Sequence, residues 1–193
     1  MRYGDAAKVY IPQLREQFQN TSSKLLIRKH YEILKNNFSK PKKTQLTSQK
    51  IGHAFEKLIR DVLNIYGWQA KKVTLPSGEG NDFTAIFDGH HILGETRWEK
   101  APVKGEAVQA FVGKLAPRPQ TIGLMIAYSG FDPSAYEVAK KHMSSRTIVF
   151  LKKDHIDKII VSLTDPGEIF SVELRIVYDY LFENVNKDKT KKT

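Results

Sequence analysis

The sequence predicts a layered fold of class α/β (α+β), in which a mixed central sheet is flanked by helices. Apolar residues recur at helical spacing in the early segments, strand-like segments then surround an Asp-Gly pair, and helices alternate with strands further along. A strand meander gives antiparallel neighbours, whereas strand–helix–strand units give parallel ones, so both pairings are expected in one sheet. With 193 residues, 40% of them hydrophobic, the chain is long enough to bury a core.

Composition excludes several classes of protein. The chain has no cysteine, which excludes disulfide scaffolds, zinc–thiolate sites, iron–sulfur clusters and thiol catalysis. It contains no run of about 18 apolar residues, the length that a membrane span needs, so no membrane partner is expected. The first residues also lack the apolar core of a signal peptide. We therefore expect a cytoplasmic location.

Positive charge is concentrated near the N-terminus. The formal net charge is +10, and residues 1–50 hold 11 Lys or Arg against 3 Asp or Glu. Such a surface attracts phosphates, and a solubilising face is an equal alternative. The candidate nucleic-acid-binding residues are Arg28, Lys29, Lys40, Lys42 and Lys43. Three regions are predicted: a basic helical hairpin with a linker (1–46), a domain that holds the sheet (47–183) and a disordered basic tail (184–193).

The elements follow from local signals. A helix from about Ser48 to Tyr66 is expected to end at Gly67, because glycine favours the left-handed cap. Asp88-Gly89 predicts a tight hairpin turn, and Asp132-Pro133 predicts the start of a helix. Strands are expected at Trp68–Thr74, Phe83–Phe87, His91–Trp98, Thr121–Ala127 and Thr147–Leu151. The other helices are expected at about Ala6–Gln19, Ser22–Asn37, Gly105–Leu115, 133–142, Lys153–Ile159 and Glu168–Phe182.

Two carboxylates meet across the predicted hairpin. A turn centred between Asp88 and Gly89 places Asp82 opposite Glu95, and residues directly opposite each other in an antiparallel pair share a face. Arg97, two residues after Glu95, lies on the same face. Two unpaired carboxylates repel each other, and a divalent cation such as Mg²⁺ or Mn²⁺ removes that penalty. The alternative is a charge cluster in which Arg97 neutralises both acids.

Several motifs, taken in their order and spacing, resemble one family. They are Gly52-His53-Ala54-Phe55-Glu56, Gly80-Asn81-Asp82, Leu93-Gly94-Glu95-Thr96-Arg97-Trp98, Phe111-Val112-Gly113-Lys114-Leu115 and the stretch 122–131. Together they resemble the PD-(D/E)xK nuclease superfamily, in particular the Mrr-like restriction endonuclease catalytic domains. The resemblance covers about Ser48 to Leu151 and implies a restriction-endonuclease-like sheet.

The resemblance also implies a metal-dependent catalytic site. Asp82, Glu95 and the backbone carbonyl of Thr96 would bind Mg²⁺ or Mn²⁺. Glu56 would complete the metal shell through water, and an ordinary helix-surface carboxylate is the alternative for this residue. The family usually has lysine where this chain has Arg97. Arginine keeps the positive charge but stays protonated, so it is a poor proton acceptor.

The expected function is hydrolysis of phosphodiester bonds in DNA by a metal-dependent endonuclease of restriction or anti-phage defence, with RNA left open as a substrate. A homodimer and a partner protein from a defence system are further expectations. The alternative is a catalytically degenerate nuclease-fold domain that serves as a nucleic-acid-binding module or complex subunit. Under that alternative, Arg97 marks the loss of catalysis.

Overall fold

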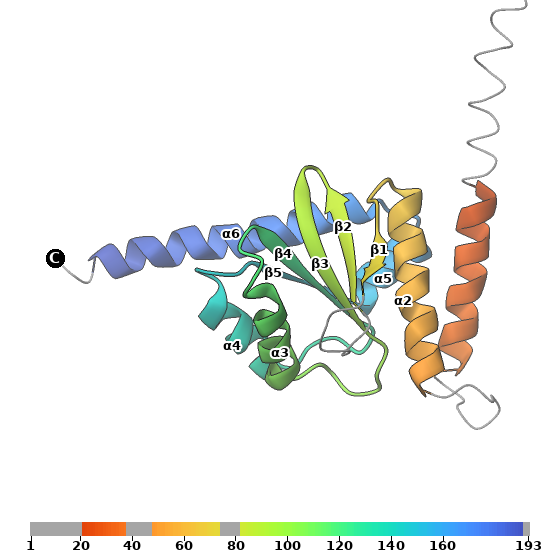
Figure 1. Cartoon of the computed structure of the whole chain (residues 1–193), viewed down its shortest axis with the longest axis horizontal. Coiled ribbons are helices and arrows are strands. Elements are labelled where there is room, and N and C mark those ends of the chain that lie inside the picture. Colours follow the sequence, from red (N-terminus) through yellow and green to blue (C-terminus); the bar gives the residue numbers. More distant parts are fainter. Residues whose placement is uncertain (1–20, 38–47, 74–81, 191–193) are drawn as a thin grey trace, which may run out of the picture.

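The computed structural model describes the backbone of residues 21–37, 48–73 and 82–190, and their side chains apart from Ser48, Asp82 and 183–190. A helix over residues 21–37 comes first. The labelled elements are α2 (Ser48–Ile65), β1 (Lys71–Val73), β2 (Asp82–Phe87), β3 (His90–Arg97), α3 (Gly105–Leu115), β4 (Thr121–Ala127), α4 (Pro133–His142), β5 (Ile148–Lys152), α5 (Lys153–Ile160) and α6 (Pro166–Thr190). Figure 1 shows the sheet with helices on both sides, which confirms the predicted fold class.

The five strands lie in the order β1-β2-β3-β4-β5. The pairs β1–β2 and β2–β3 are antiparallel, and the pairs β3–β4 and β4–β5 are parallel. Asp88 and Gly89 both have positive φ, 47° and 75°, as the two-residue hairpin turn requires. The ladder between β2 and β3 pairs Asp82 with Glu95, which confirms the register predicted from the position of the turn.

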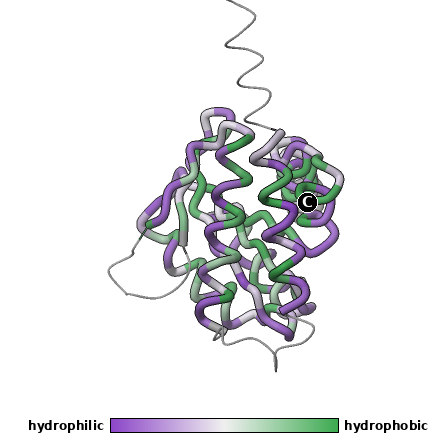
Figure 2. The backbone as a smooth tube through the Cα atoms, turned by 90° about the vertical axis from the view of Figure 1, so that its right-hand side faces the viewer, coloured by the Kyte–Doolittle hydropathy of each residue, from purple (hydrophilic) through white to green (hydrophobic). Residues whose placement is uncertain are grey.

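The sheet is covered by a separate hydrophobic cluster on each face. One cluster joins the 21–37 helix, α2, α5 and α6 to strand residues such as Ile92 and Leu124. The other joins α3 and α4 to strand residues such as Leu93 and Met125. Ile92 and Leu93 are neighbours on β3, so they mark its two faces. Figure 2 shows hydrophilic and hydrophobic residues alternating along the helices of one side, as the helical spacing predicted.

The 21–37 helix is held against the domain by polar contacts as well as by its apolar face. The Tyr31 hydroxyl donates a hydrogen bond of 2.8 Å to Asp157 Oδ1 on α5. Arg28 donates a hydrogen bond to the backbone carbonyl of Val161, just after α5. Lys153 also donates to Asp157. Burial alone would raise the pKa of Asp157, but the hydrogen bonds from Lys153 and Tyr31 hold it below its ordinary value.

Two elements differ from the sequence prediction. β1 covers Lys71–Val73 among the described residues, and Trp68 does not belong to it. Gln69 has a φ of 45°, which interrupts extended backbone and lets the Trp68 ring turn inward to stack on Phe87 at 4.4 Å between centroids. α6 continues to Thr190, so helical backbone extends into the stretch where a disordered tail was expected. That stretch contains neither glycine nor proline, so nothing in its sequence breaks a helix.

Part of the predicted N-terminal region lies outside the described residues. The expected helix at about Ala6–Gln19 and the linker at 39–44 fall there, whereas the second expected helix agrees with the helix at 21–37. Within the described part of the chain, no helix is long and apolar enough to cross a membrane.

The ring of Phe83 leaves no room for a side chain at Gly94. A Cβ at Gly94 would overlap the ring of Phe83, its register partner, and that ring is fully buried. We expect Gly94→Ala to lower the free energy of unfolding by about 1–3 kcal/mol, because the buried ring has no space to move into. Urea denaturation measures this change. Gly113→Ala is the matched control, because a Cβ there meets nothing within 4 Å. An equal loss in both variants would contradict the prediction.

The Asp157 contacts predict how stability depends on pH. Because folding lowers the pKa of Asp157, its contribution to the free energy of unfolding is complete above its unfolded pKa of about 3.9 and is lost as pH falls through the folded value. We expect the stability difference between wild type and Asp157→Asn to shrink as pH falls from about 5 to about 2.5. Asp154→Asn, an exposed site on the same helix, is the control. A difference that stays constant with pH would show that Asp157 is not responsible.

Candidate active site

Glu95 is a carboxylate placed inside the sheet. It lies on β3, a strand paired on both sides by β2 and β4, and its exposed fraction is 1%. Leu93, two residues earlier, belongs to the cluster beneath α3 and α4, so Glu95 points to that same face. Burying a carboxylate is costly unless cations or hydrogen-bond donors compensate its charge.

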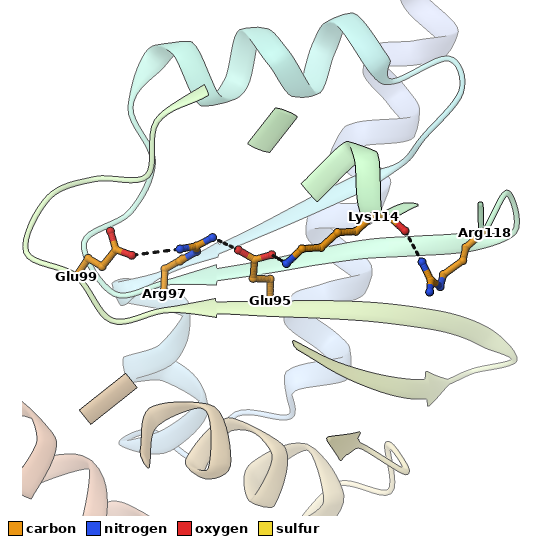
Figure 3. Close-up of polar contacts among 5 residues, drawn as sticks. All are labelled: Glu95, Arg97, Glu99, Lys114 and Arg118. Carbon is orange, nitrogen blue, oxygen red and sulfur yellow. Dashed lines mark hydrogen bonds and ion pairs between the residues drawn. The ribbon is translucent and has the colours of Figure 1, made fainter. Parts of the chain in front are cut away.

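Two cations from different elements compensate Glu95 (Figure 3). Arg97 donates from Nη2 to Glu95 Oε1, and its Nη1 lies 3.4 Å from Glu99 Oε1. Lys114, near the end of α3, donates from Nζ to Glu95 Oε2 at 2.8 Å. The Lys114 side chain is 12% exposed, so its amine also lies largely away from water. Each carboxylate oxygen of Glu95 therefore carries one positively charged donor.

Arg97 stays protonated in this environment. Its burial would lower the pKa, but the Glu95 carboxylate beside it raises the pKa above the ordinary value, with a smaller contribution from Glu99. A guanidinium in this state binds anionic oxygens and does not accept a proton. The predicted placement of Arg97 on the face of Glu95 is confirmed by their ion pair.

Lys114 is the residue of this cluster that sequence patterns do not single out. It belongs to the Phe111–Leu115 motif, and nothing in that motif predicts its contact with Glu95. The available signal was its position three residues after Phe111, at the edge of the apolar stripe of α3, in a chain whose strand motif lacks the usual lysine. Its backbone carbonyl accepts a hydrogen bond of 2.5 Å from Arg118, which follows the helix.

The described residues supply oxygen donors of the kind that a divalent cation takes. Glu95 offers a buried carboxylate, and Thr96, the next residue of β3, offers its backbone carbonyl and is 2% exposed. Asp82 is the register partner of Glu95 across the ladder. The Asp82 side chain lies outside the described part. Among the described side chains, no group of three or more His, Cys, Asp or Glu is close enough to hold a metal ion. The donor types fit Mg²⁺, although Arg97 and Lys114 would compete with the ion for Glu95.

Glu56 has partners of its own on another element. It is 1% exposed on α2, where Arg60 Nε lies 3.2 Å from its Oε1 and His53 Nδ1 lies 3.7 Å from its Oε2. α2 packs on the face opposite to α3. Among the described residues, no hydrogen bond or ion pair joins Glu56 to Glu95 or Arg97. The expected role of Glu56 in a metal shell stays a prediction.

The basic N-terminal residues are only partly described. Arg28 and Lys29 are exposed on the 21–37 helix, and the Arg28 guanidinium is bonded to the carbonyl of Val161. This contact gives Arg28 a structural role in docking the helix. Lys40, Lys42 and Lys43 lie outside the described residues. Nucleic-acid binding by these five residues stays a prediction.

Comparison with known proteins identifies the family of this chain. Residues 48–160 match the family model of the Mrr catalytic domain, described as a restriction endonuclease. Comparison with curated proteins gives no match. Among solved structures, the chain is similar to the MspJI restriction endonuclease in complex with a 27-mer oligonucleotide, with 16% identity, a TM-score of 0.42 and coverage of 78% of this chain. This chain spans 35% of the length of that protein.

The shared carboxylate predicts unequal effects of removing its partners. In Lys114→Met, Glu95 keeps Arg97 and the buried stem of residue 114 is preserved, so we expect a loss of about 1 kcal/mol or less in the free energy of unfolding. In Glu95→Gln, both cations lose their buried anion, and we expect a loss of about 3 kcal/mol. Urea denaturation of the two variants measures the difference. Equal losses would show that Arg97 does not compensate Glu95 when Lys114 is absent.

Proposed function

Because the chain belongs to the Mrr family of restriction endonuclease catalytic domains, we propose that it is a divalent-metal-dependent endonuclease that hydrolyses phosphodiester bonds in DNA. One observation carries the proposal: the buried Glu95 carboxylate lies opposite Asp82 in the ladder and is held by two cations, Arg97 and Lys114. A stable fold does not need a buried carboxylate inside a sheet, and such groups are concentrated at sites of chemistry.

We propose Asp82, Glu95 and the Thr96 carbonyl as the residues that hold the metal, which is Mg²⁺ or Mn²⁺. The bound ion would polarise the scissile phosphate and lower the pKa of its water. Glu95 would hold the ion with the carboxylate that Arg97 and Lys114 contact in this structure, so both cations would lie beside the place where the phosphate binds. Glu56 is proposed as an assisting residue from α2, with Arg60 and His53 holding its carboxylate in place.

Arg97 and Lys114 would divide the work that one lysine performs elsewhere in the family. Arg97 would bind a phosphate oxygen and balance the negative charge that builds up during attack on phosphorus, which needs no proton transfer. Lys114 would position the attacking water and, as an amine, can exchange a proton with it. Its Nζ already lies 2.8 Å from the carboxylate that faces Asp82 in the ladder. The replacement of the usual lysine by Arg97 is thus compatible with activity.

A second candidate function follows from the same Arg97. Without a proton acceptor at that position, the domain would be a catalytically degenerate nuclease fold that binds nucleic acid or serves as a subunit of a complex. Cytoplasmic restriction of foreign DNA, a homodimer and a defence-system partner are the biological setting that we propose on the basis of the family.

Cleavage of supercoiled plasmid tests the two functions. With Mg²⁺ or Mn²⁺, we expect the wild type to nick or linearise the plasmid and a chelator to stop the reaction. Lys114→Met is expected to lower the rate by about 10²–10⁴-fold, the range of general acid–base catalysis, while Lys158→Met, an exposed site on α5, leaves it unchanged. Lys114→Arg keeps the charge without an accessible proton exchange, so it separates charge from proton transfer.

Three results would count against the proposal in different ways. Absence of cleavage with either metal, together with salt-dependent DNA binding, would favour the degenerate domain. Cleavage that persists in Glu95→Ala would remove this cluster from the mechanism. Cleavage that persists in Lys114→Met but fails in Arg97→Met would return the whole task to Arg97.

A further inference from the structure

A groove of about 320 Å³ lies on the face of the sheet that carries Glu95. It lies over the β1–β2–β3 part of the sheet, and its lining includes the register pair Thr84 and Leu93. Its polar lining residues are Gln69, Lys71, Thr84, His91, Arg118 and Thr121. Ile86 and Leu93, on the same face, add apolar surface, and Ala85 and Ile92 complete the lining between them.

The charged side chains that line this groove are all positive. Lys71 and Arg118 are cations, His91 adds an imidazole, and no carboxylate is among the lining residues. In the described part of the chain, neither Lys71 nor His91 forms an ion pair. The guanidinium of Arg118 is bonded to a backbone carbonyl, which orients it without neutralising it. Cations gathered without anions attract a phosphate backbone, and each neutralised phosphate releases bound counterions.

Two structural links connect the residues that line the groove to Glu95. Along β3, Leu93 in the groove and Glu95 in the site are two residues apart on one face, a separation of about 7 Å. Through α3, Arg118 of the groove bonds to the Lys114 carbonyl, and the Lys114 amine bonds to Glu95 (Figure 3).

We propose that this groove binds the backbone of the DNA strand that is cut, beside the scissile phosphate. The cations Lys71 and Arg118 hold phosphate oxygens, and the hydroxyls of Thr84 and Thr121 and the amide of Gln69 donate to phosphate and sugar oxygens. Such contacts fix the register of the strand and carry no base recognition. The proposal rests on the proposed function for the identity of its ligand, and it assigns the strand a path that does not involve the basic N-terminal residues.

Binding of a fluorescein-labelled DNA duplex, followed by fluorescence anisotropy with a chelator present, tests the groove without cleavage. We expect Lys71→Gln and Arg118→Gln each to weaken binding about five-fold at about 100 mM salt and to reduce the slope of log affinity against log salt by about 1. Lys158→Gln on the opposite side of the sheet is the matched control, with wild-type affinity and slope. Lys71 is exposed on β1 and serves as the primary variant, because its substitution removes no described contact.

The outcomes separate the groove from the catalytic proposal. If Lys71→Gln and Arg118→Gln both match Lys158→Gln in affinity and slope, the groove proposal is overturned, whether or not the wild type cuts plasmid. If the two variants lose affinity while the wild type cuts nothing with Mg²⁺ or Mn²⁺, the groove stands and the nuclease proposal falls. A wild type that neither binds nor cuts DNA overturns both. Thermal melting confirms that each variant is folded before its binding is interpreted.

Discussion

The buried carboxylate of Glu95 is the interaction on which the arrangement of this molecule depends. A group that is 1% exposed cannot rely on water for its charge, so the protein must bring cations to it. Arg97 comes from the same strand, and Lys114 comes from the far end of α3. The position of α3 over the sheet is therefore constrained electrostatically as well as by its apolar residues, because a shift of the helix would withdraw the amine from Glu95. The loop after β3 is constrained in the same way, since Arg97 also reaches Glu99.

Side chains alternate between the two faces of the sheet, so Glu95 and Ile92 on β3 point to different helical layers. On β3, Ile92 faces the cluster of α2, α5 and α6, whereas Leu93 and then Glu95 face α3. Gly94 keeps this separation possible, because the Phe83 ring fills the space where its side chain would be. The apolar core on the Ile92 face therefore continues behind Glu95, and the Glu95 carboxylate stays buried on the other face. On the other face, α3 and α4 cover the parallel strands, while the groove lies over the antiparallel ones. Helices cover parallel strands because the connections between such strands must cross the sheet, whereas hairpins need no such connection.

Arg97 gives the strand motif a fixed positive charge but no proton acceptor. Lys114 brings an amine to the same carboxylate from α3. The two cations touch different oxygens of one carboxylate, so they lie on either side of the same acidic group. A guanidinium gives a fixed charge with directional donors, and an amine gives a charge that can be lost. In the proposed function, the pair would therefore supply anion binding and proton exchange from two elements. Glu56, in contrast, is buried on α2, where Arg60 Nε lies 3.2 Å from its carboxylate.

The sequence by itself determined what depends on neighbours along the chain. The Asp88-Gly89 turn fixed the hairpin and with it the pairing of Asp82 with Glu95, because a two-residue turn leaves one register. Caps and apolar spacing located the helices, and the order of motifs indicated the family. Tertiary structure decided the rest. Lys114 meets Glu95 from 19 residues away because the crossover through α3 returns the chain to β4 beside β3, a distance that no local pattern encodes. The inward turn of Trp68 and the cationic groove likewise arise from residues of several elements, and their meeting depends on how the layers pack.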